Sequence, residues 1–165
     1  MTAREPVALH DAEADVLAGA LARLDELLGR ALEADRQRAG GILSDPTRGM
    51  ALAPAAALAL LEQPPVLSPM ENADTWLADA IRLSPRWQQL ARVLELDARD
   101  LALLLLLLAP DLDPRYARLY GYLQDDLTRR RPCADLLAGL LAGTAAERLD
   151  VLRRLRGPSR LHTHG

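Results

Sequence analysis

The feature that most constrains the fold is an uninterrupted apolar run of leucine and alanine over residues 101–109. Both residue types are strong helix formers and the run has no β-branched residue, so it predicts a helix and not a strand. Asp97 is placed to cap its start, and Pro110 is expected to end it. A helix that is apolar on every side is normally the buried centre of a bundle. The run is far shorter than the roughly 20 residues that span a bilayer.

Further helices are predicted on both sides of this run. Leu17, Leu21, Leu24 and Leu28 recur at helical spacing, which is typical of an amphipathic helix over residues 11–38. Shorter helices are predicted where a capping residue or a proline precedes an apolar pattern. These starts lie at Pro54, Asn72 or Asp74, Ser84-Pro85, Asp113-Pro114, Pro132, and Thr144 with Glu147. The fold class is therefore mostly α, a compact multi-helix domain with at most one small β-hairpin, plus the long N-terminal helix.

Clustered prolines suggest how the chain is organised. Pro64, Pro65 and Pro69 lie close together, so residues 63–71 are predicted to be a linker. An N-terminal helical segment is expected over residues 1–62, with a short extended piece at 50–52 and a helix at 55–62. A helical domain follows over residues 72–157, and residues 158–165 are expected to be a disordered tail.

Composition excludes several functional classes. All 20 basic residues are arginine, and without lysine the chain can build neither a Walker A loop nor a Schiff base. The net charge of −3 argues against nucleic acid as a partner. Cys133 is the single cysteine, which excludes an intramolecular disulfide and a cysteine-based zinc site. The first six residues lack the apolar core of a signal peptide, so we expect a cytoplasmic protein that does not engage a membrane.

Two acidic pairs are the candidates for metal ligation, Asp111 with Asp113 and Asp125 with Asp126. Their oxygens are the ligand type that Mg²⁺ and Ca²⁺ prefer. The favoured interpretation is that Asp113 caps a helix and the others are surface acids, because no downstream glutamate completes a calcium loop. The three histidines lie near the termini and form no Ser-His-Asp set. We therefore expect no catalytic residue, no cofactor and no metal.

The dense basic cluster at residues 129–131 has two interpretations. The favoured one is local ion pairing with Asp125, Asp126 and Asp135, which lie close in sequence. The other is a docking surface for phosphates or for an acidic partner. Pro132 fixes the start of the next helix, so the charges would sit on a rigid turn. We expect at least one arginine to pair with Asp125 or Asp126 and at least one to remain available.

The same region carries a resemblance to a known family. Residues 100–105 lead into 109–116, followed by 119–126 and 128–132. This stretch resembles the N-terminal region of a family of bacterial AAA+ ATPases found beside phage-tail-like contractile injection systems. The resemblance is specific over residues 96–141 and looser over 76–95. It implies a winged-helix-like variant that lies ahead of an ATPase module. The Walker A, Walker B and arginine-finger segments of that family are absent from this chain.

The resemblance implies a non-catalytic interaction or adaptor domain that recognises a protein partner or regulates a motor. The partner would be an ATPase module in cis or a component of the contractile injection system. The alternative is a winged-helix DNA-binding transcriptional regulator, and a small metal-dependent enzyme using the acidic pairs is a distant third. The helix after Pro114 is expected to carry Tyr116, Leu119, Tyr120, Leu123 and Leu127 on one side. The residues predicted to contact the partner or to support this motif are Asp113, Arg115, Tyr116, Tyr120, Gln124, Asp125, Asp126, Thr128, Arg129, Arg130, Arg131 and Pro132.

We predict that the chain does not turn over nucleotide, because no lysine is available to reach the β- and γ-phosphates. The measurement is phosphate release from ATP by the purified chain. Hydrolysis that scales with protein concentration and survives repurification would contradict the prediction.

Overall fold

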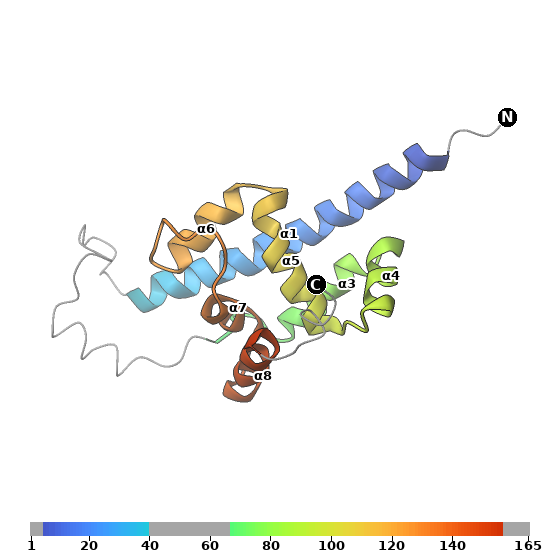
Figure 1. Cartoon of the computed structure of the whole chain (residues 1–165). Helices are drawn as coiled ribbons and strands as arrows, with labels where there is room; N and C mark the ends of the chain where they lie inside the picture. The colour runs from blue at the N-terminus through green and yellow to red at the C-terminus, as the bar shows by residue number, and fades with distance from the viewer. Residues whose placement is uncertain (1–4, 40–66, 157–165) are drawn as a thin grey trace.

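The computed structural model describes residues 5–39 and 67–156, and within these ranges the chain forms seven α-helices and no strand (Figure 1). The helices are α1 (Glu5–Ala39), α3 (Ala73–Ile81), α4 (Pro85–Val93), α5 (Ala98–Leu112), α6 (Arg115–Leu123), α7 (Ala134–Leu141) and α8 (Ala145–Arg156). The predicted fold class, mostly α with a long N-terminal helix, is confirmed. The extended piece at 50–52, the helix at 55–62 and the tail at 158–165 lie outside the described residues, and so do residues 63–66 of the predicted 63–71 linker.

The core forms around α5, as the apolar run predicts. Leu101, Leu103, Leu105 and Leu106 have no exposed surface. Helix α3 packs against both α5 and α1. Helix α1 contributes Leu24, Leu27 and Leu28 to the same core, which α6, α7 and α8 complete. The N-terminal helix and the helical domain therefore share one hydrophobic core. None of the described helices is long and apolar enough to cross a membrane.

The prediction that Pro110 ends the central helix is wrong, because α5 continues through Pro110 to Leu112. A proline inside a helix has no N–H to donate to the carbonyl four residues earlier. That carbonyl belongs to Leu106, and it accepts a hydrogen bond of 2.9 Å from the hydroxyl of Tyr120. Tyr120 is fully buried, and the replacement bond lets the helix pass through the proline without an orphaned acceptor.

Most of the predicted helix starts are confirmed. Ser84 caps α4 by accepting from the Trp87 N–H, and Asp97 forms a reciprocal capping box with Asp100 at the start of α5. Thr144 and Glu147 bond each other's backbone N–H groups ahead of α8. These caps satisfy N–H groups that have no partner within their helix.

Three starts differ in detail from the prediction. Helix α6 begins at Arg115 with Pro114 at the N-cap, so Asp113 does not occupy that position, although its side chain accepts from the Arg115 N–H at 2.9 Å. Asn72 precedes α3 in a left-handed conformation, and its side chain makes no capping bond. Helix α7 begins at Ala134, two residues after Pro132, and the cap is Cys133, whose Sγ accepts from the Leu136 N–H at 3.5 Å.

We predict that Leu105→Asp abolishes cooperative unfolding, while Leu108→Asp on the same helix does not. Leu105 is completely buried, whereas Leu108 is 37% exposed. An unpaired charge in the core costs several kcal/mol, about 3–5, out of a total stability of roughly 5–15. Circular dichroism during a thermal melt measures both variants. Equal melting temperatures for the two would show that α5 is not the centre of the core.

Candidate functional site

The predicted motif contains a braced turn between α6 and α7, here called the α6–α7 turn, residues 124–131. Gln124 at its start holds the two ends together. Its Nε2 donates to the carbonyl oxygens of Tyr120 at 3.0 Å and Arg131 at 3.1 Å. Its Oε1 accepts from the Cys133 N–H at 2.7 Å. One amide side chain thus connects the end of α6, the end of the turn and the start of α7.

The turn also packs tightly against α6. A Cβ at Gly121 would lie 3.2 Å from the Asp126 carbonyl oxygen and 3.2 Å from the Leu127 Cα. Both contacts are with backbone, which cannot move aside as a flexible side chain would. Asp125 adopts a left-handed conformation with φ 52°, a conformation that aspartate tolerates better than most residues. The path of the turn is therefore fixed by close backbone contact as well as by Gln124.

Two of the three clustered arginines form ion pairs. Asp126 accepts from the Thr128 hydroxyl at 2.6 Å and from Arg129 Nε at 3.1 Å. Thr128, through its hydroxyl and its backbone N–H, holds the pKa of the Asp126 carboxyl below its ordinary value, and Arg129 adds to this effect. Arg131 makes a bidentate pair with Asp111, at 2.6 and 2.7 Å. The expected pair between an arginine and Asp126 is present.

The predicted partners of the other arginines differ from those observed. Arg131 pairs with Asp111, which lies twenty residues earlier, and Asp135 instead pairs with Arg148 on α8. The guanidinium of Arg130 is exposed and makes no hydrogen bond or ion pair within the described part of the chain. The placement of Leu127 on the buried side of α6 is wrong, because that helix ends at Leu123. Leu127 lies in the turn and is 79% exposed.

The first half of the motif attaches α6 to α1. Tyr116 is buried, and its hydroxyl lies 2.8 Å from Asp25 Oδ1. Arg115 donates to Asp25 at 2.7 Å and pairs with Asp113 at 2.9 Å, and its guanidinium lies over the Tyr116 ring. Burial, followed by the bond to Asp25, raises the pKa of Tyr116 to about 12. Asp113, Arg115 and Tyr116 are therefore structural contacts, as is Tyr120.

The acidic pairs considered as metal ligands are engaged with other groups. Asp111, Asp113 and Asp126 each pair with an arginine. Within residues 12–38 and 67–156, no three His, Cys, Asp or Glu side chains are grouped so that they could hold a metal ion.

A charge network that the sequence did not reveal joins α3, α5 and α8. Arg99 donates to Asp74 at 2.9 Å and to Asp150 at 2.8 Å, and its side chain is only 16% exposed. Arg154 donates to Asp100 at 2.9 Å and to Asp150 at 3.0 Å. The spacing of Asp150 and Arg154, four residues apart on one helix, was the only local sign of it.

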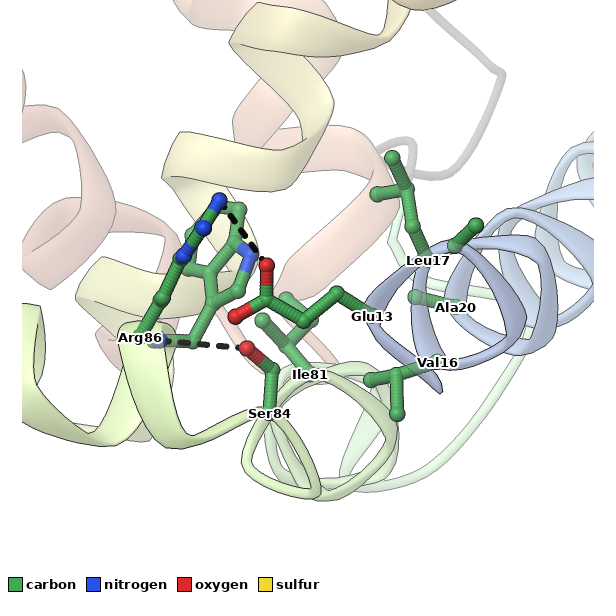
Figure 2. A pocket seen from close by; sticks show the side chains of 9 residues that line it. Glu13, Val16, Leu17, Ala20, Ile81, Ser84 and Arg86 are labelled. Carbon is green, nitrogen blue, oxygen red and sulfur yellow. Dashed lines mark hydrogen bonds and ion pairs between the residues drawn. The ribbon is translucent and has the colours of Figure 1, made fainter. Parts of the chain in front are cut away.

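A groove lies between α1 and the start of α4 (Figure 2). Its volume is about 340 Å³. Figure 2 shows Val16, Leu17 and Ile81 along its walls and an ion pair at its rim. That pair joins Arg86 to Glu13 at 2.9 Å.

We predict that Arg154→Ala lowers the free energy of unfolding by about 1–3 kcal/mol, because it leaves the buried Asp100 carboxylate without its arginine. Arg153→Ala is the matched control, since Arg153 is exposed on the same helix. The control is expected to stay within about 0.5 kcal/mol of the parent. Urea titration measures both.

The same variant should respond less to acid. The hydrogen bond from Arg99, and then the contacts with Arg154, keep the pKa of Asp150 below its ordinary 3.8. A carboxyl with a lowered native pKa stabilises the fold above that ordinary value, and the contribution is lost as pH falls below it. The parent is therefore expected to lose more stability than Arg154→Ala between neutral pH and pH below 3.8. An equal loss in both would contradict a stabilising role for this network.

Comparison with known proteins gives one match. Residues 71–165 match the family described as the winged helix domain, variant. No curated protein and no solved structure matches the chain. The matched residues include α3 to α8 and make up more than half of the chain. This chain therefore belongs to the variant winged helix domain family.

Proposed function

We propose that this chain is a non-catalytic interaction domain that recognises a protein partner through the α6–α7 turn. The resemblance of residues 96–141 to the N-terminal region of bacterial AAA+ ATPases suggests the class of partner. That partner is an AAA+ ATPase module, joined in cis or supplied as a separate chain, or a component of a contractile injection system. The domain would tether or regulate the motor and would not hydrolyse nucleotide.

The observation that carries this proposal is the contrast between a fixed backbone and free side chains in the turn. Gln124, Gly121 and the Asp126 contacts hold the backbone. Leu127 and Arg130 nevertheless face solvent. A surface that is already ordered loses little conformational entropy when it binds, so more of the contact energy appears as affinity.

The exposed side chains also define the chemistry of the partner. Tyr122, at 41% exposure near the end of α6, adds an aromatic side chain to Leu127 and Arg130. Tyrosine and arginine are enriched among the residues that dominate binding energy in protein interfaces. The complementary surface is therefore an apolar patch beside a carboxylate that can pair with Arg130.

The alternative function is DNA binding, and it is considered because the chain belongs to a winged helix family. Winged helices often place a helix in the major groove, where basic side chains neutralise phosphates. In this chain Arg99, Arg115, Arg129, Arg131 and Arg154 already pair with carboxylates. Each of these arginines would have to break its ion pair with a carboxylate before it could bind a phosphate. The cost of breaking these pairs favours a protein partner over DNA.

The test uses the AAA+ module encoded nearest to this reading frame, purified and titrated against the domain by calorimetry. We expect the parent to bind, and Leu127→Ser and Arg130→Glu to weaken binding at least tenfold, about 1.4 kcal/mol. Matched controls are Leu149→Ser, at a residue 55% exposed on α8, and Arg153→Glu. The controls are expected to bind as the parent does.

All four variants should melt with the parent, because every altered side chain is exposed. Full-strength binding by Leu127→Ser and Arg130→Glu would remove the turn from the interface. Binding of the parent to a generic DNA duplex that weakens steeply with added salt would favour the regulator instead.

A further inference from the structure

The groove between α1 and α4 lies on a part of the molecule that the proposed function does not use. Among residues 12–38, whose side chains are described, the buried residues of α1 begin at Ala20, and the helix continues toward its N-terminus beyond the other helices (Figure 1). Val16 and Leu17 on this extension are only half-buried. An isolated helical extension of this kind is marginal in water, so a covering surface would stabilise it.

The surface around the start of α4 combines hollows with apolar protrusions. Beside the first groove is a second hollow, lined by Arg86, Gln89, Leu90 and Val93. Arg86 borders both hollows. Leu83, next to the groove residue Ser84, is 70% exposed, and Val93 is 66% exposed. Val93 itself lines the second hollow, and Leu83 directly precedes a residue that lines the first, so each hollow has an exposed apolar residue at or next to it in the chain.

The two sides of the groove carry opposite charges, and the acidic one, Glu13, has a side chain only 20% exposed. Glu13 belongs to α1 and Arg86 to α4 (Figure 2). The Arg86 side chain is 70% exposed and uses one nitrogen, Nη1, toward Glu13. A guanidinium has five N–H donors, so Arg86 can bind a second carboxylate.

We propose that this patch is an interface between two copies of this chain, related by a two-fold axis. A two-fold places the same surface opposite itself, so a patch must be self-complementary. The α1 rim of one copy would face the α4 rim of its partner, bringing Glu13 of each near Arg86 of the other. Leu83 and Val93 would pack into the opposing hollows, and each contact would be made twice.

The charges at the rim make this proposal testable by exchange. Glu13→Arg makes the rim wholly basic, and Arg86→Glu makes it wholly acidic, so each variant alone should repel its own copy. Mixed together, the two variants present opposite charges across the interface. We expect a dimer of the parent, monomers of each single variant, and a dimer in the mixture.

Sedimentation velocity over roughly a hundred-fold range of concentration measures these states, because the dimer fraction follows mass action. Arg36→Glu is the control, with a side chain 72% exposed near the other end of α1, and it should dimerise as the parent does. Thermal melts of each variant show whether the fold is intact. A parent that stays monomeric, single variants that dimerise with parental affinity, or folded variants that stay monomeric in the mixture would each overturn the proposal.

Discussion

The structure depends on burying a helix that has no polar side. Helix α5 presents leucine or alanine in almost every direction over its central turns, so most of its surface needs neighbours, although Leu108 remains 37% exposed. Helices α3, α6 and α7 contact it directly, and the long helix α1 packs over α3. Because the aromatic content is only 3%, this core is filled mainly by leucine and alanine. Tyr116 and Tyr120 are its largest buried side chains, and both have hydroxyl partners.

The buried tyrosines connect the core to the α6–α7 turn at the surface. Tyr120 satisfies the carbonyl that Pro110 leaves free in α5, and the backbone carbonyl of Tyr120 accepts from Gln124. Gln124 in turn fixes the ends of the α6–α7 turn. The position of the turn therefore follows from the packing of the central helix through a short chain of hydrogen bonds. This continuity is the physical basis for treating the turn as a preformed surface.

Local signals in the sequence predicted the helices and their caps well, because a cap involves residues three positions apart. Ser84, Asp97 and Thr144 were identifiable for this reason. The continuation of α5 through Pro110 could not be predicted in this way. The hydroxyl that replaces the hydrogen bond lost at the proline comes from a different helix. The partner of Arg131 and the network around Arg99 escaped prediction for the same reason. Ion pairs between distant segments leave no periodic pattern, and a chain rich in Arg and Asp offers many equivalent pairings.

Ion pairs help to hold α8 against α5, and this affects how the structure unfolds locally. Val151 is the only fully buried residue of this helix, Leu152 and Leu155 pack against the core, and Arg99 and Arg154 join the helix to α5 by ion pairs. Salt weakens exposed ion pairs by screening and affects partly buried pairs less, whereas it does not screen leucine packing. Added salt therefore weakens the contact between α8 and α5 before it affects the core. In hydrogen exchange, amides of α8 would then exchange through a local opening whose free energy falls with ionic strength, while those of α5 exchange only on global unfolding.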